Sequence, residues 1–247
     1  MKRLAFLAFS AFAYVVFLAT FLYLVAFLSG LAFVPNGVDH GGGGSKPVLA
    51  AAIDIALILI FAVQHSVMAR PGFKRWWTRF VPAPTERSVY VLAASLALIL
   101  LFAGWQPIAA VVWTTSGASA AALWALFALG WVLVLVSTFL ISHFELFGLK
   151  QAWNNWCERL ESAPIFYTPW LYRLVRHPLY LGFFLAFWAT PTMTLGHLLL
   201  AAGMSVFMLV AIQFEERDLI DTFGEVYVRY RQRTGMLLPR IPNREER

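Results

Sequence analysis

Six long apolar runs limit what this 247-residue chain can fold into. A helix needs about 20 apolar residues to cross the hydrocarbon core of a bilayer. Only 13% of the residues are charged and 60% are hydrophobic, whereas a soluble domain has about 25% charged and 45–50% apolar residues. We therefore expect an all-α, polytopic integral membrane protein, in preference to a soluble helical protein, with about six apolar helices of which the last two form a hairpin. The runs cover residues 4–33, 48–69, 88–112, 119–142, 173–190 and 195–214.

The charged residues lie mainly in the loops, and their signs predict the orientation. The net charge is +6, and the loop after the second run is rich in cations, whereas residues 106–118 carry no charge. Because cytoplasmic loops of membrane proteins are rich in Lys and Arg, we expect both termini to be cytoplasmic. A nucleic-acid surface is disfavoured, since it would gather the cations on one soluble face. The cations of the second loop are Arg70, Lys74, Arg75, Arg79 and Arg87.

The sequence also argues against several kinds of site. The single cysteine, Cys157, excludes an internal disulfide and a cysteine-based metal site. The histidines show no i,i+4 pair, so we expect no metal. The glycine-rich stretch 41–45 has the composition of a flexible linker and is assigned no function.

Two charged clusters flank the last pair of apolar runs. Residues 176–178 (Arg-His-Pro) open the fifth run, and the pair 215–216 (Glu-Glu) ends the sixth. With a turn at Pro191 between them, both clusters fall at the same membrane face. Proline fits the first turn of a helix, and a helix starting there presents His177 and Tyr180 on one face. Unpaired carboxylates near hydrocarbon are costly, so we expect the glutamates to be paired or to bind a cation. An interfacial salt-bridge patch is the structural alternative.

Three separated blocks resemble the C-terminal signature of the isoprenylcysteine carboxyl methyltransferase and phospholipid methyltransferase superfamily. They are Val175–Gly182 (VRHPLYLG), Glu215–Leu219 (EERDL) and Phe223–Tyr230 (FGEVYVRY), in the order in which the superfamily has them. Its members are integral membrane enzymes that use S-adenosylmethionine. The resemblance therefore implies this cofactor.

Three further stretches look like the bacterial methanethiol S-methyltransferase family. They are Ala62–Pro71 (AVQHSVMARP), His143–Gln151 (HFELFGLKQ) and Phe187–Thr194 (FWATPTMT). Members convert methanethiol to dimethyl sulfide. The resemblance implies an S-adenosylmethionine-dependent thiol methyltransferase with a small volatile thiol as substrate, acting at the cytoplasmic face of the bacterial inner membrane.

By this resemblance, the two clusters and the tail hold the cofactor. Carboxylates suit its ammonium group, a guanidinium suits its carboxylate, and the His177 and Tyr180 rings suit adenine and ribose. Gly182 leaves room for something to approach the backbone closely. The expected cofactor-binding set is Arg176, His177, Pro178, Tyr180, Leu181, Gly182, Glu215, Glu216, Tyr230 and Arg231.

Methyl transfer to a thiol also needs a base, because the thiolate is the nucleophile. His65 and His143 lie at the expected cytoplasmic ends of the second and fourth runs. Either is a candidate base, with Glu145 as an orienting partner. For each histidine, a purely structural hydrogen bond at a helix end is the alternative.

The expected organisation has two parts. Residues 1–167 form a transmembrane scaffold with the candidate substrate-activating segments, and residues 168–247 form the helical hairpin and tail of the cofactor site. Other functions remain open: a methyltransferase for a lipid or prenylcysteine acceptor, a non-enzymatic membrane protein of the NnrU type or a transporter, and a sterol-reductase-like enzyme that uses NADPH. The bilayer is the expected surrounding, and no protein partner is evident from the sequence.

Overall fold

The structure, a computed structural model, describes residues 1–31, 34–42, 44–160 and 165–240. Within these residues five helices are long and apolar enough to cross a membrane, and a further apolar helix is shorter. The expected all-α, polytopic class is confirmed. The run 4–33 and the linker 41–45 lie partly outside the described residues. The long helices are α1 (Lys2–Leu28), α2 (Pro47–Ala69), α4 (Ala83–Gly104), α5 (Gly117–Ile141) and α10 (Leu195–Phe223).

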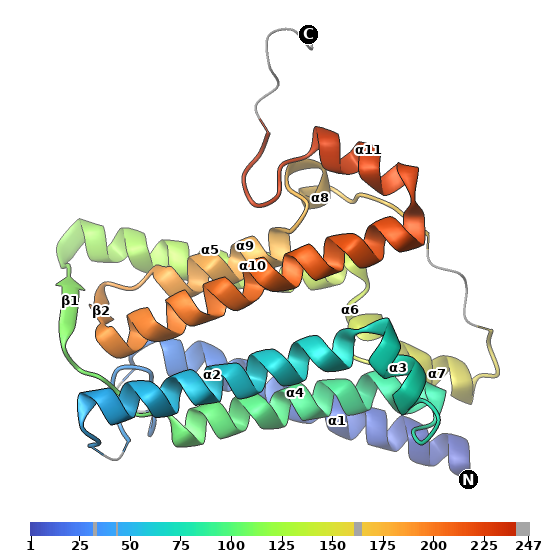
Figure 1. The fold of residues 1–247 in the computed structure, drawn as a ribbon, viewed down its shortest axis with the longest axis horizontal. Coiled ribbons are helices and arrows are strands. Elements are labelled where there is room, and N and C mark those ends of the chain that lie inside the picture. Colours follow the sequence, from blue (N-terminus) through green and yellow to red (C-terminus); the bar gives the residue numbers. More distant parts are fainter. Residues whose placement is uncertain (32–33, 43, 161–164, 241–247) are drawn as a thin grey trace, which may run out of the picture.

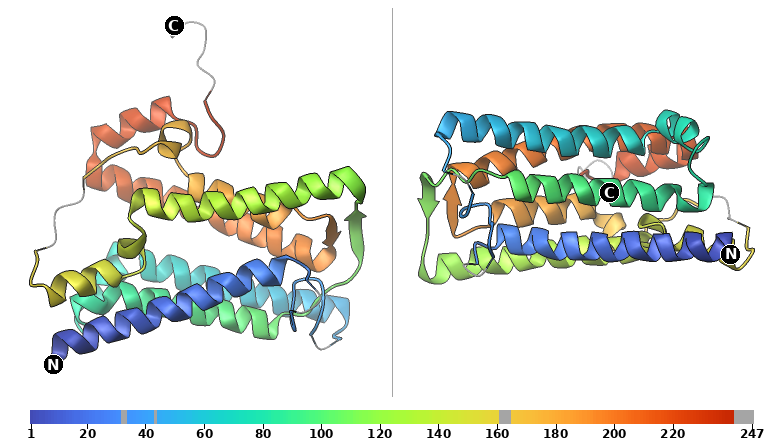
Figure 2. Two further views of the ribbon diagram at one scale, coloured as in Figure 1. Left: turned by 180° about the vertical axis from the view of Figure 1, so that it is seen from behind. Right: turned by 90° about the horizontal axis from the view of Figure 1, so that it is seen from below.

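The helices form two layers (Figures 1 and 2). One layer holds α1, α2 and α4, and the other holds α5, α9 (Pro178–Trp188) and α10, with α2 packed against α10 between the layers. Buried apolar side chains such as Phe27, Phe61 and Trp131 fill the interior. On the outside, Phe12 and Val206 are more than half exposed. Such exposed apolar faces are expected of helices whose surroundings are lipid, because lipid tails are as apolar as these side chains.

The fifth apolar run forms a shorter helix than the expected segment 173–190. It is divided into α8 (Leu171–Leu174) and α9, and α9 has only 11 residues. At 1.5 Å per residue α9 spans roughly 16 Å, about half of a hydrocarbon core. Pro178 causes the break, because it lacks an N–H and disfavours helical backbone at His177, which has φ −126° and ψ 63°. Helices α9 and α10 still pack as the expected hairpin.

Helices α5 and α9 approach each other closely at two glycines. A Cβ atom at Gly182 would lie 2.7 Å from the Gly130 carbonyl oxygen and 2.8 Å from the Val134 nitrogen. A Cβ atom at Gly130 would lie 2.7 Å from the Gly182 carbonyl oxygen. Any larger residue at either position would therefore push the two backbones apart.

Short elements gather at the two ends of the bundle (Figure 1). Toward the end where α1 begins and α10 finishes lie α3 (Pro71–Trp77), α6 (His143–Leu146), α7 (Leu149–Trp156), α8 and α11 (Glu225–Arg233). At the opposite end, strands β1 (Val111–Thr114) and β2 (Thr192–Thr194) pair antiparallel. The expected run 88–112 is therefore too long at its C-terminal side, because α4 ends at Gly104 and the chain from Val111 is extended.

The strand end also contains a buried polar network. Thr194 caps α10 by accepting from the His197 backbone N–H at 3.1 Å, and its hydroxyl donates to Asp39 Oδ1 at 2.6 Å. His197, which is fully buried, directs Nδ1 toward Asp39 Oδ2 at 3.3 Å and donates from Nε2 to the Phe187 carbonyl at 3.0 Å. We call Asp39, Thr194 and His197 the strand-end network. Each polar side-chain atom named here has a partner.

Candidate active site

The Arg-His-Pro block is an extended linker held by the chain that follows α11. Between α8 and α9, the Arg176 and His177 backbone N–H groups donate to the carbonyls of Gly235 and Met236 at 2.8 and 3.1 Å. Val175 and Gly235 form an isolated parallel bridge. The tail therefore fixes the position of the block before any side chain is considered.

Glu216 is the centre of the charged cluster. The residue is 4% exposed, and Oε1 accepts from Arg176 Nε at 2.7 Å and lies 3.1 Å from His177 Nε2. Arg231 Nη1 lies 3.6 Å from the other oxygen, Oε2. Arg176 also donates to the Thr234 carbonyl at 2.5 Å. The structure thus brings four expected residues together from α10, α11 and the extended linker.

Glu215, the neighbouring carboxylate, has a different environment. It is half-buried, and Oε2 accepts a hydrogen bond from the Tyr180 hydroxyl at 3.0 Å. The Tyr180 ring packs edge-on against His177, with centroids 5.7 Å apart. In the described part of the chain Glu215 has no ion pair within 4 Å, in contrast to Glu216. A half-buried negative charge close to hydrocarbon is therefore left without a counter-ion.

Three of the expected cofactor residues, Pro178, Leu181 and Gly182, determine how α9 begins and how closely it packs. Pro178 is its first residue, and the Leu181 N–H donates to the His177 carbonyl at 3.0 Å, which closes the first turn. The space beside Gly182 is filled by α5. The close approach that the sequence suggested for Gly182 is thus made by a helix of the same chain.

Tyr230 and Arg231 lie on α11. The Tyr230 hydroxyl donates to the Tyr172 carbonyl at 2.5 Å, and burial raises the pKa of Tyr230 to about 12. Arg231 is half exposed, and it contacts Glu216 through its guanidinium and Arg176 through its backbone carbonyl, which accepts from Nη1 at 3.1 Å. These contacts attach α11 to α8 and to α10.

His65, on α2, has one occupied and one free ring nitrogen. Nε2 lies 2.8 Å from the Tyr90 hydroxyl on α4. The ring also packs against Phe61 and, edge-on, against Phe207 of α10. Nδ1 is buried and has no hydrogen-bond partner among the described residues. This nitrogen is open to a further proton donor or acceptor.

His143 is held at both nitrogens. Nε2 lies 2.9 Å from the Tyr14 hydroxyl and Nδ1 lies 2.8 Å from the Thr138 hydroxyl, while the ring stacks on Phe139 at 4.2 Å. Burial lowers the pKa of His143 below its ordinary value, so the neutral form is favoured.

Glu145, the expected orienting partner, makes no hydrogen bond to His143 among the described residues. Glu145 is exposed and accepts from Lys150 Nζ at 2.6 Å, and this hydrogen bond is the main reason that its pKa is lowered. The carboxylate and His143 are two residues apart on α6, so they point to different sides. Two hydroxyls, from Tyr14 and Thr138, orient the histidine instead.

Five residues near the candidate site are outside the set expected from the sequence. Tyr90 contacts His65, and the Arg87 guanidinium lies over the Tyr90 ring, 4.9 Å from its centroid. Arg70 forms an ion pair with Asp218 at 3.0 Å, which joins the end of α2 to α10. Burial, reinforced by the charge of Glu215, raises the pKa of Tyr172. The sequence signal that could identify two of them is the cation-rich loop, which contains Arg70 and Arg87.

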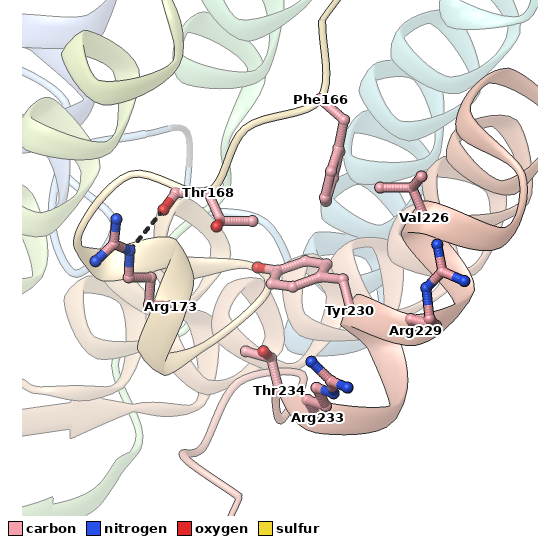
Figure 3. Close-up of a pocket in the computed structure, with 8 residues that line it drawn as sticks. All are labelled: Phe166, Thr168, Arg173, Val226, Arg229, Tyr230, Arg233 and Thr234. Carbon is pink, nitrogen blue, oxygen red and sulfur yellow. Dashed lines mark hydrogen bonds between the residues drawn. The ribbon is translucent and has the colours of Figure 1, made fainter.

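A cavity of about 320 Å³ lies against α11 (Figure 3). Tyr230 and Thr234 form part of its wall, so the cavity adjoins the charged cluster around Glu216. It is not lined by Arg176, His177, Glu215 or Glu216. It is lined by Phe166, Thr168, Arg173, Val226, Arg229, Tyr230, Arg233 and Thr234.

The arrangement combines the elements of a site for a cationic small molecule. Within the described chain it offers a carboxylate without an ion pair at Glu215, a fixed and neutralised carboxylate at Glu216, and a histidine nitrogen without a partner at His65. In the described ranges no group of three or more His, Cys, Asp or Glu side chains lies close enough to hold a metal.

Comparison with known proteins gives two kinds of match. The family model described as NnrU protein matches residues 54–239. Among curated relatives, the methanethiol S-methyltransferase of Pseudomonas sp. (strain GM41(2012)) is 53% identical, over 96% of this chain and 91% of the relative. That of Mycobacterium tuberculosis (strain ATCC 25618 / H37Rv) is 52% identical, over 97% and 98%.

A more distant similarity is to nurim of Mus musculus, 28% identical over 80% of this chain and 86% of that protein. No solved structure matches the chain. The NnrU model and the methanethiol S-methyltransferases match the same residues, so an NnrU-type protein and a methyltransferase are not exclusive alternatives.

Proposed function

The chain belongs to the NnrU protein family and, within it, to the methanethiol S-methyltransferases, and on this premise we propose that it methylates methanethiol to dimethyl sulfide with S-adenosylmethionine as the methyl donor. The observation that carries the proposal is the contrast between satisfied and unsatisfied groups at one end of the bundle. Glu216 is neutralised, while in the part of the chain that the structure describes Glu215 lacks a cation and His65 Nδ1 lacks a partner.

The residues present fit S-adenosylmethionine. Glu215 is the carboxylate free to face a positive charge, because Glu216 is already paired with two guanidinium groups. Arg176 and Arg231 retain N–H groups suited to a carboxylate, and the Tyr180 and His177 rings suit adenine and ribose. When bound, S-adenosylmethionine supplies a methyl group attached to a positively charged sulfur. The substrate sulfur would take this methyl group in an in-line displacement, with the neutral thioether S-adenosylhomocysteine as the leaving group.

His65 is the proposed base. Nδ1 takes the proton from the thiol, and the sulfur keeps the electron pair as thiolate. Tyr90, at 2.8 Å from Nε2, holds the ring, and Phe61 and Phe207 exclude water around it. The nearby Arg87 supplies positive charge that favours the thiolate.

His143 receives a supporting role in this proposal. Both of its nitrogens are engaged by hydroxyls, so neither is available to a thiol. It joins α1, α5 and α6, and Glu145 secures the following turn through Lys150. Residues 1–167 then supply the scaffold and the base, and residues 168–247 supply the cofactor site.

The distribution of charge supports a cytoplasmic location for the site in the bacterial inner membrane. The cation-rich loop around α3 lies at the same end as Arg176 and Glu216, whereas the loop of Gln106 to Ala118 at the strand end is uncharged (Figure 1). Cations concentrate on the cytoplasmic side of membrane proteins. Cytoplasmic S-adenosylmethionine would reach the site directly.

The test uses membranes that contain the protein. Supplied with S-adenosylmethionine and methanethiol, they should release dimethyl sulfide, measured by gas chromatography, and a prenylcysteine or phosphatidylethanolamine added in excess should not compete. Folded protein that releases no dimethyl sulfide would refute the thiol substrate. Competition by either larger acceptor would favour the lipid or prenylcysteine reaction instead.

A further inference from the structure

The cavity against α11 is strongly basic and contains none of Arg176, His177, Glu215 and Glu216, although Tyr230 of the expected cofactor-binding set lines it. Its walls come from the segment before α8, from α8 itself and from α11 (Figure 3). Arg173, Arg229 and Arg233 contribute three positive charges, and no carboxylate is among the lining residues of the described chain. At about 320 Å³ it is at the lower end of the roughly 300–1,000 Å³ typical of small-molecule pockets.

Two of these arginines are available for a ligand. Neither Arg229 nor Arg233 makes a side-chain hydrogen bond or ion pair with the described residues. Arg173 donates from Nε to the Thr168 carbonyl at 3.2 Å, which fixes the guanidinium and leaves its terminal N–H groups free. Several guanidinium groups around one space are suited to a phosphate, because each offers paired donors.

The back of the cavity is apolar. Phe166 projects between Thr168 and Val226, and the Tyr230 ring stands across from it (Figure 3). The two rings pack edge-on with centroids 5.4 Å apart. The ligand expected here therefore combines an anionic group with carbon-bound parts that can lie on aromatic rings.

The surface around the cavity is unusually apolar for a charged end of the molecule. Large apolar side chains on the same segments are about half exposed or more: Ile165 78%, Tyr167 55%, Trp170 67%, Leu174 53% and Val226 48%. Helices α8 and α11 sit beside the end of the α9–α10 hairpin and extend away from the α1–α2–α4 layer (Figure 1). Exposed aromatic and aliphatic residues with adjoining arginines are typical of a segment in the membrane interface.

We propose that this cavity binds the phosphate headgroup of an anionic phospholipid. The three arginines contact the phosphodiester, the rings contact the glycerol part, and the exposed apolar residues lie at the level of the acyl chains. Anionic headgroups attract basic interfacial segments by roughly 1 kcal/mol per Lys or Arg, or about fivefold in affinity. The proposal does not depend on the methyl-transfer reaction.

The test compares lipid binding by the full-length protein and two charge-matched variants. Detergent-purified protein is titrated with phosphatidylglycerol or phosphatidylcholine, and bound lipid is counted by native mass spectrometry. The cavity variant combines Arg173→Gln, Arg229→Gln and Arg233→Gln. The control combines Arg75→Gln, Arg79→Gln and Arg159→Gln, which removes three exposed cations from elsewhere at the same end.

The wild type and the control should bind phosphatidylglycerol alike and prefer it to phosphatidylcholine, and the cavity variant should lose about a hundredfold in affinity. Equal binding by all three proteins would overturn the proposal. The proposal would also be overturned if inorganic phosphate bound the cavity as tightly as phosphatidylglycerol does, because the cavity would then be a free-anion site. A cavity variant that keeps its lipid but no longer binds S-adenosylmethionine would also overturn it, by assigning the arginines to the cofactor. Thermal unfolding of each variant confirms that it is folded.

Discussion

The two ends of the helix bundle both bury polar side chains, but they treat them differently. In the strand-end network, Asp39, Thr194 and His197 satisfy one another and the Phe187 carbonyl. At the other end, Glu216 is equally well satisfied, yet among the described residues Glu215 has no cation and His65 Nδ1 has no partner. Buried polar groups are normally paired, because leaving one unpaired is costly. Asp54 Oδ2, whose carboxylate accepts from the Gln106 N–H beside the strand end, is also buried without a partner among the described residues. The contrast is therefore between the strand-end network, which is satisfied, and Glu215 with His65, which keep groups that a ligand can meet.

The largest effect is expected from removing the free nitrogen of His65. His65→Gln retains an amide group at the position of Nε2, so the contact with Tyr90 survives while Nδ1 is lost. General-base catalysis contributes typically 10²–10⁴-fold, so kcat/KM for methanethiol should fall about a thousandfold with little change in thermal stability. His143→Gln is the control and should affect stability more than rate. If His143→Gln loses more activity than His65→Gln at equal folding, the two histidines have the opposite roles.

The next largest effect should be on stability, at Glu216. Glu216→Gln leaves Arg176 buried without its counter-ion, and breaking such a pair costs about 3–5 kcal/mol. The double variant Arg176→Gln with Glu216→Gln removes both charges and should recover part of that loss. Thermal unfolding in detergent measures both, with the exposed Glu225→Gln as the control. A Glu216→Gln protein as stable as wild type would remove the distinction between the two glutamates.

Glu215 should show the reverse behaviour. Glu215→Gln keeps the shape of the side chain and an acceptor for Tyr180 but removes the charge. A hydrogen bond to a charged group contributes about 1.5–3 kcal/mol, so the affinity for S-adenosylmethionine should fall about thirtyfold while thermal stability is maintained. Isothermal calorimetry on detergent-solubilised protein measures the affinity. Unchanged binding would exclude Glu215 as the group that meets the positive charge.

The sequence predicts the fold class well because membrane spanning depends on local composition. Five of the six expected runs correspond to long helices. The limits of α9 depend on where the chain stops being helical, which Pro178 determines by backbone sterics. The extended chain after Gly104 depends on pairing with Thr192–Thr194, about 80 residues away, so no local pattern indicates it.

The candidate site can be predicted from the sequence only where its residues belong to recognisable blocks. The Arg-His-Pro and Glu-Glu blocks lead to the meeting of Arg176, His177 and Glu216. Which glutamate is neutralised depends on the rotation of α10, and the pairing of His65 with Tyr90 depends on the packing of α2 on α4. Hydrophobicity patterns do not specify these orientations, because both faces of such helices are apolar.

A smaller effect is expected from the strand-end network. Thr194→Ala removes the N-cap of α10 and one partner of Asp39. Loss of a threonine N-cap costs about 0.5–2 kcal/mol, so thermal stability should fall by about 1–2 kcal/mol. Methyl transfer at saturating substrate should not change, because the network is at the opposite end of the bundle (Figure 1). A large loss of activity without loss of stability would mean that this end also takes part in the reaction.

The smallest effect is expected at His143. It lies at the end of the bundle that holds the candidate active site, but both of its ring nitrogens have partners, as do those of His197 in the strand-end network. Burial lowers its pKa, so the folded chain binds fewer protons at this residue than the unfolded chain does. Its contribution to stability is therefore complete above the ordinary histidine pKa of about 6.5 and is lost as the pH falls through the lowered folded value. The free energy of unfolding of the wild type should decrease below about pH 6.5 more steeply than that of His143→Gln, which cannot bind this proton. Denaturant unfolding at a series of pH values between about 5 and 8 measures the difference. If the two curves run parallel, the pKa of His143 is the same in the folded and the unfolded chain, and burial does not favour its neutral form.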